Sequence, residues 1–174
     1  GTPHTQGILP LLEQHGVPLV GPSTGAIALH KPVHKYVFNV RAPYQHEVEK
    51  AISHLNTLGI KRIGVVHVDD TFGSDALAGA MSGFKANQLE ALFVEKFDRT
   101  KPDFTALAPR VAQKQPQAVV FVGTGAAVVD GSGNLVGFLS QQDCLAVMLK
   151  SSYHCDLTSV VRDCMRTEVL YVGP

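Results

Sequence analysis

The sequence predicts an α/β fold in which helices flank a mostly parallel sheet. Short apolar runs alternate with amphipathic stretches over most of the chain, and this alternation is typical of strand–helix–strand units. The run RIGVVHV is almost continuously apolar, as expected for a strand that is buried on both faces. Near Ala126 to Val129 the alternation stops, and the following residues predict an appended β-hairpin and helix.

The first part of the chain is expected to contain one helix and two short strands. TQGILPLLEQHG has a helical apolar face, and Gly16 is suited to end that helix. Pro10 would cost about 3 kcal/mol well inside a helix, so the helix is expected to start near Pro10 or to kink there. VPLVGPS and YVFNVRA have the composition of strands.

The middle part has the most regular alternation. Apolar residues recur at helical spacing before Gly59, at Val48, Ala51, Ile52, Leu55 and Leu58. After RIGVVHV, a helix is expected to begin near Ser74 as its N-cap and to bury Leu77, Met81 and Phe84. Further elements are expected in the order strand, helix, strand, in ALFVEKF, DFTALAPRVAQKQ and QAVVFVG.

The last part follows a different pattern. AAVVD and LVGFLS flank a tight polar turn at residues 131–134, which predicts a hairpin, and a helix is expected from about Gln141 to Lys150. The change of pattern predicts a division of the chain into segments 1–126 and 127–174.

Composition argues against several classes of protein. The chain has 174 residues, of which 45% are hydrophobic and 17% charged, as in ordinary globular proteins. The formal net charge is zero, so no basic field would attract nucleic acid. No apolar run approaches the roughly 20 residues that span a bilayer, and no signal peptide is visible at the first residues. Three cysteines, all past residue 126, argue against a disulfide framework and suit a reducing compartment.

Two loops that follow predicted strands are candidates for ligand binding. Residues 21–25 (GPSTG) offer hydroxyl and backbone N–H groups at the carboxyl end of a strand, which suits a carboxylate or phosphate. In VDDTFGSD, Phe72 could form an apolar wall, and Asp69 or Asp70 could bind an amine. A simple polar turn and an ordinary helix start are the alternatives.

Four segments carry a family resemblance when taken together: GTPHT, VPLVGPSTGA, YVFNVRAPY and LGIKRIGVVHVDDTFG. In combination they resemble the substrate-binding proteins of branched-chain amino-acid (Leu/Ile/Val) ABC transporters, which have the type I periplasmic-binding fold. The resemblance covers about residues 1–126. In that family two α/β lobes close on an amino-acid-like ligand, whose α-amino and α-carboxylate groups bind Ser/Thr hydroxyls and backbone of the first lobe.

The resemblance implies roles for four residues. Thr2, Ser23 and Thr24 would lie in the ligand-binding loops of the first lobe. Phe72 falls where the family often has a ligand-facing Tyr, so a hydroxyl contact would be missing. The start of the first lobe and the far half of the second have no counterpart in the sequence.

A second resemblance begins past residue 126. Residues 137–143, GFLSQQD, resemble the G-apolar-apolar-[ST]-x-x-D signature of CBS domains, whose order the chain follows from about 127 to 174. The resemblance implies that Gly137, Ser140 and Asp143 belong to a nucleotide-binding site. Ser140 would contact the nucleotide phosphate, and Asp143 would hold the ribose hydroxyls. A Ser at a helix start favours an anion on physical grounds as well. The alternative is an ordinary N-cap followed by an acid in the first turn.

Catalysis and metal binding have little support in the sequence. His67 and Asp69 alternate on a strand, but two groups make a weak metal site. His154, Cys155 and Asp156 fit a polar loop better than a metal centre. Ser23 and Ser140 lack an identifiable base and a G-x-S-x-G context as nucleophiles. We therefore expect no enzyme, no catalytic residue, no metal and no cofactor.

Three functions remain open from the sequence. The leading one is a non-catalytic solute-binding segment of a branched-chain amino-acid receptor, periplasmic by resemblance, with a membrane permease as its partner. The second is a CBS-type module that senses adenosine nucleotides, in the cytoplasm and as a possible homodimer. The third is a recombined or artificial chimera with no intact binding site.

Overall fold

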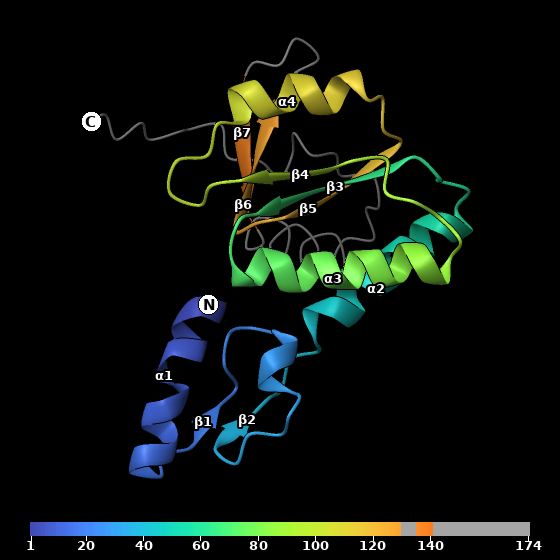
Figure 1. Ribbon diagram of the computed structural model, residues 1–174. Helices are drawn as coiled ribbons and strands as arrows, with labels where there is room; N and C mark the ends of the chain where they lie inside the picture. The colour runs from blue at the N-terminus through green and yellow to red at the C-terminus, as the bar shows by residue number, and fades with distance from the viewer. Residues whose placement is uncertain (130–134, 141–174) are drawn as a thin grey trace, which may run out of the picture. The chain divides into compact units, whose positions relative to one another are not determined.

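The computed structural model describes residues 1–129 and 135–140 (Figure 1). The first part of the chain contains α1 (Thr2–His15), β1 (Leu19–Val20), η1 (Ile27–Leu29) and β2 (Val37–Phe38). The elements that follow are α2 (Tyr44–Thr57), β3 (Ile63–Val68), α3 (Thr71–Ala86), β4 (Val94–Phe97), α4 (Phe104–Gln113), β5 (Ala118–Val122), β6 (Gly125–Val129) and β7 (Leu135–Ser140).

Two compact units divide the chain. One comprises Gly1–Pro102 with Lys114–Val122, and the other comprises Asp103–Gln113 with the chain from Gly123 onward. In the first unit, β1 and β2 pair in parallel, and β3 pairs in parallel with β4 on one side and β5 on the other. These parallel sheets with their helices confirm the predicted α/β class.

The second unit contains α4 and the pair β6–β7. These two strands are antiparallel, with a register irregularity between Val128 and Val129, so the predicted hairpin is confirmed. The helix expected from Gln141 to Lys150 lies outside the described residues. Among the helices of residues 1–129, none is long and apolar enough to cross a membrane.

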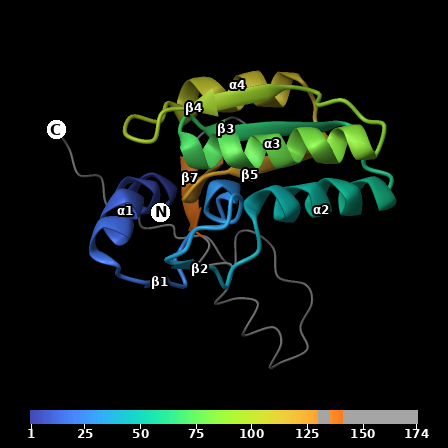
Figure 2. The same cartoon turned by 60° about the horizontal axis from the view of Figure 1, so that its bottom comes forward.

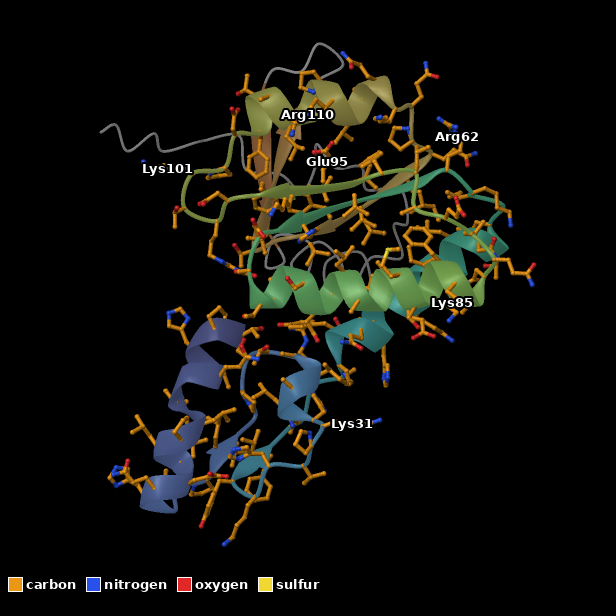
Figure 3. All side chains as sticks on the ribbon, viewed as in Figure 1. Lys31, Arg62, Lys85, Glu95, Lys101 and Arg110 are labelled. Carbon is orange, nitrogen blue, oxygen red and sulfur yellow. The ribbon has the colours of Figure 1, made fainter. Side chains whose placement is uncertain are left out.

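The main core lies where α2 and α3 cover β3. All residues of β3 are buried, as its apolar run predicts. Five fully buried side chains form the centre of this core: Ile52, Ile63, Val65, Ala80 and Phe84. Figures 1 and 2 both show α2 and α3 side by side along the sheet. By contrast, the charged side chains of Lys31, Arg62 and Lys85 extend away from the core (Figure 3).

Glycine residues set the spacing between α2 and α3. A Cβ atom at Gly79 would lie 2.4 Å from both the Cα and the carbonyl oxygen of Gln45. At Gly83 it would lie 3.0 Å from the Cβ of Ile52. At Gly79 the two helices therefore approach more closely than any larger residue permits, and at Gly83 an added Cβ would be a tight contact.

Of the two alternatives for Pro10, a helix start near it is wrong, whereas a kink there stays a prediction. The helix begins at Thr2 and contains Pro10 in its interior. Pro3 in the first turn favours this early start, because its missing N–H costs nothing there. Leu12, two residues after Pro10, packs in a second core with Ala26, Leu29 and Val37, which offsets the cost of the interior proline. The predicted stop is confirmed, since Gly16 caps the helix at φ 63°.

The expected start of α3 was also wrong. Its N-cap is Asp70 rather than Ser74, because the Asp70 carboxylate accepts a hydrogen bond from the N–H of Gly73 at 3.0 Å. Phe84 is buried as predicted, whereas Met81 is 47% exposed. The buried face of α3 is formed mainly by Gly and Ala, which apolar size alone does not identify.

We predict that Gly79→Ala destabilises the chain, whereas Gly7→Ala does not. The added methyl at position 79 meets the backbone of α2, and such overpacking costs about 1–3 kcal/mol. A Cβ at Gly7, inside α1, meets nothing within 4 Å, and Ala is favoured over Gly in a helix by up to about 1 kcal/mol. Urea denaturation of the two variants measures this difference, and equal free energies of unfolding would contradict close helix packing at Gly79.

Candidate functional site

Two of the predicted ligand-binding residues, Thr2 and Thr24, form a buried pair. Their Oγ1 atoms are 2.7 Å apart, and the two residues are 2% and 1% exposed. The first turn of α1 supplies Thr2, and the loop that follows β1 supplies Thr24. The hydrogen bond therefore fixes that loop against the beginning of α1.

The pair has a defined capacity for further hydrogen bonds. The Oγ1 of Thr24 also accepts from the N–H of Ala26 at 3.3 Å. Each hydroxyl carries one proton, and the bond between Thr2 and Thr24 uses one of the two. One hydroxyl proton remains, so the pair can donate to one acceptor such as a carboxylate oxygen.

Ser23 lies next to this pair and is exposed. The N–H of Thr24 donates to the carbonyl of Pro22 at 2.7 Å, so the chain turns tightly at Ser23. Within residues 1–129 and 135–140, the Ser23 hydroxyl makes no hydrogen bond. It is thus the predicted hydroxyl that is directly open to solvent.

Phe72 contacts Tyr44, which is hydrogen-bonded to the loop after β1. The rings of Tyr44 and Phe72 meet edge to face with their centroids 4.9 Å apart. The N–H of Tyr44 donates to the carbonyl of Gly25 at 2.8 Å, directly after Thr24. The first turn of α2 and the first turn of α3 therefore place two contacting aromatic rings near the loop that carries Thr24.

Arg41 also contacts the Tyr44 ring. Its guanidinium carbon lies 4.8 Å from the ring centroid, which is a cation–π distance. Its Nε and Nη2 atoms donate to the two carboxylate oxygens of Glu47 at 3.2 and 3.1 Å. The hydrogen bond to Glu47 raises the pKa of Arg41 above its ordinary value. The Tyr44 ring therefore contacts both a cation and the Phe72 ring.

The two acids considered for amine binding have other partners. Asp69 pairs with Lys96 at 2.8 Å, and both side chains are more than half exposed. Asp70 caps α3 and forms an ion pair with Arg99, whose Nε donates to it at 2.7 Å. Burial raises the pKa of Asp70, but the hydrogen bonds from Gly73 and Arg99 outweigh it and hold the pKa below its ordinary value. Asp70 thus caps a helix, as the alternative interpretation of an ordinary helix start predicted.

The residues of the nucleotide hypothesis are only partly described. Gly137 lies on β7 opposite Val128, and Ser140 is the last residue of that strand, opposite Gly125. Asp143 lies outside the described residues. Their proposed contacts with a nucleotide stay predictions.

The pair considered for metal binding is divided by the structure. His67 is buried, and its Nδ1 forms a 2.9 Å hydrogen bond with the Val68 carbonyl, while exposed Asp69 pairs with Lys96. In the part of the chain that the structure describes, no group of three or more His, Cys, Asp or Glu residues could hold a metal ion.

Comparison with known families decides what kind of protein this is. The model of the periplasmic binding protein family matches residues 1–132, a stretch that includes α1 to β6 and ends between β6 and β7. The chain belongs to the periplasmic binding proteins. Among curated proteins no significant match is found.

Solved periplasmic binding proteins share its architecture. A substrate-binding periplasmic protein from Ralstonia solanacearum is 30% identical, with a TM-score of 0.61 over 71% of this chain and 35% of that one. A possible leucine/isoleucine/valine-binding protein from Rhodopirellula baltica is 25% identical, with a TM-score of 0.61 over 88% of this chain and 39% of that one.

A branched-chain amino-acid ABC transporter protein from Thermus thermophilus, solved with bound valine, is 21% identical, with a TM-score of 0.62 over 71% of this chain and 33% of that one. This third similarity supports the fold. The chain spans between 33% and 39% of the length of these three structures.

Several residues of this periplasmic binding protein that shape the site were missed in the sequence. Tyr44 and Arg41 frame the aromatic contact, and Gln45 hydrogen-bonds to Asp75 at 2.9 Å. The position of Tyr44 directly after Pro43, at a helix start, was a local signal. Asp75 gave none, because its partners Gln45 and Ile27 are 30 and 48 residues away.

We predict that Thr24→Val destabilises the chain by about 1–3 kcal/mol, because it leaves the buried Thr2 hydroxyl and the Ala26 N–H without partners. The double variant Thr2→Val/Thr24→Val should cost less than the sum of the single variants, since it removes both hydroxyls. Urea denaturation measures these values. Thr105→Val, at an exposed position of α4, serves as control, and additive effects of Thr2 and Thr24 would argue against the bond.

We predict that Asp70→Ala lowers the free energy of unfolding by about 0.5–2 kcal/mol, the usual cost of a lost N-cap. Since the folded-state pKa of Asp70 is lowered, its charge stabilises the fold above about pH 3.9, the ordinary pKa of Asp, and this stabilisation is lost as pH falls through the folded-state pKa. Denaturation between pH 2.5 and 7 tests the profile. Asp69→Asn is the control, because its exposed pair with Lys96 should contribute little.

Proposed function

We propose that this chain is the solute-contacting part of a receptor for an ABC transporter, which binds a small amino-acid-like solute without catalysis. The match of residues 1–132 to the periplasmic binding protein family is the observation that carries this proposal. The convergence of hydroxyl groups and aromatic rings at the loop after β1 supports it.

Each proposed contact follows from the chemistry of its side chain. Ser23, exposed at a tight turn, would donate its hydroxyl proton to a solute carboxylate. Thr2 and Thr24 would contribute the one remaining proton of their pair and keep the loop in place. Phe72, resting on Tyr44, would provide the apolar wall for the solute's hydrocarbon part.

The ligands of similar structures favour a carboxylate with an apolar body. One was solved with valine, and another, from R. palustris, with benzoate. Both ligands combine a carboxylate with a hydrocarbon group, which are the two features that the hydroxyls and the rings match. We therefore propose a branched apolar amino acid or a close analogue as the solute.

The remaining parts of the proposal follow from the family. The receptor would act in the periplasm and deliver its solute to a membrane permease. We keep the division at residues 126 and 127 as a proposed boundary between two segments. No observation on Gly137 or Ser140 favours nucleotide sensing, so we do not advance that function.

Differential scanning fluorimetry with leucine, isoleucine and valine, and with AMP and ATP in parallel, tests the proposal. A ligand at a hundredfold excess over its Kd stabilises the folded state by about 2.7 kcal/mol, which raises the melting temperature measurably. We expect a shift with amino acids and none with nucleotides. A shift with nucleotides alone, or none with any ligand at millimolar concentration, would refute the proposed function of this chain.

We predict that Ser23→Ala weakens solute binding about tenfold, because a hydrogen bond to a charged group contributes about 1.5–3 kcal/mol. Its effect on stability should be small, since Ser23 is exposed. Ser82→Ala, at an exposed position of α3, is the matched control and should leave the affinity unchanged. Isothermal titration measures both, and equal affinities of the two variants would exclude Ser23 from the site.

A further inference from the structure

Asp75, on α3, joins two segments that are far apart in the sequence. Its two carboxylate oxygens each lie 3.3 Å from the backbone N of Ile27, which donates to them from the start of η1, where the loop after β1 ends. Its Oδ1 also accepts a hydrogen bond from Nε2 of Gln45, in the first turn of α2, at 2.9 Å. One carboxylate therefore binds both the loop and the helix start.

These two segments carry the residues of the proposed solute site. Ile27 follows Thr24 by three residues, and Gln45 is adjacent to Tyr44. The N–H of Tyr44 donates to the carbonyl of Gly25, so the segments also contact each other directly. The Asp75 carboxylate is thus bonded both to the segment that follows the loop hydroxyl groups and to the segment that carries the Tyr44 ring.

The surrounding packing leaves little freedom for this arrangement. A Cβ at Gly25 would lie 2.4 Å from the carbonyl oxygen of Ala42, and one at Gly79 would lie 2.4 Å from the Cα of Gln45. Glycine at both positions permits backbone contacts that no other residue allows. Asp75 lies one helical turn before Gly79 on α3, so its carboxylate is supported by a closely packed pair of helices.

We propose that Asp75 is a positioning residue for the solute site. Its carboxylate holds the Ser23–Thr24 loop and the Tyr44 ring at the spacing that a small carboxylate solute requires, without touching the solute. This inference rests on the proposed function, and it assigns to Asp75 the spacing between the Ser23–Thr24 loop and the Tyr44 ring.

A polarity swap tests the anchor itself. Asp75→Ala removes both hydrogen bonds, and Gln45→Glu places a second carboxylate against the first. The double variant Asp75→Asn/Gln45→Glu restores both bonds. The Asn oxygen still accepts from the N–H of Ile27, and the bond to residue 45 runs in the opposite direction, from the Asn NH₂ group to the Glu carboxylate. Amide hydrogen exchange of Ile27 is the readout, with β3 amides as the internal reference for an intact fold.

We expect the protection of Ile27 to fall at least tenfold in each single variant and to return in the double variant. If Asp75→Ala also lowers the protection of β3, Gln45→Glu and the double variant carry the test, because they keep an oxygen acceptor at position 75. Asp69→Asn, an exposed acid in the loop before the same helix, should leave Ile27 unchanged. Unchanged protection in Asp75→Ala would overturn the proposal.

Titration of the same variants with the amino acid that gives the largest thermal shift tests the consequence for binding. We expect at least a tenfold loss of affinity in the single variants and recovery in the double variant. Loss of protection at Ile27 with unchanged affinity would overturn the positioning role and leave the proposed function standing. No binding by the unsubstituted chain would refute the proposed function and this role together.

Discussion

The close contact of α2 and α3 over β3 is the constraint on which the rest of the first unit depends. β3 is buried along its whole length, so it needs two helices held close above it. Gly79 and Gly83 allow that approach. Because the two helices lie side by side, their first turns are neighbours, and Tyr44 meets Phe72 there. The packing of the core thus determines where the aromatic side of the candidate site is formed.

Much of this fold could be predicted from the sequence, because local patterns determine it. The unbroken apolar run of β3 and the spacing of residues before Gly59 identified the central strand and α2. Helix boundaries were harder. Ser74 and Asp70 are both good N-cap residues. Which of them caps α3 depends on where the chain turns after β3. Met81 was wrongly predicted to be buried, because a buried face formed by Gly and Ala has no strong hydrophobic signal.

The candidate site could be predicted only in part. Thr2, Ser23, Thr24 and Phe72 follow from strand ends and from family resemblance, and the structure places Thr2 against Thr24. The partners that hold them are contacts between distant segments, such as Asp75 with Ile27, and no local pattern records such pairs. The antiparallel pair past residue 126 was correctly expected, because two apolar runs around a polar turn are a local signal. A ligand cannot be predicted from such a signal, since a binding site combines residues from several distant segments.

The small sheet of β1 and β2 gives the loop after β1 a local stability of its own. Each strand has two residues, and Val20 and Val40 nearby are 70% and 81% exposed. Proteins open in cooperative parts whose opening free energies range from near zero to the global value. The loop with Ser23 and Thr24 thus joins this weak sheet at one end and the α2–α3 body at the other. The free energy of opening this loop can therefore change while the α2–α3 core keeps its own stability.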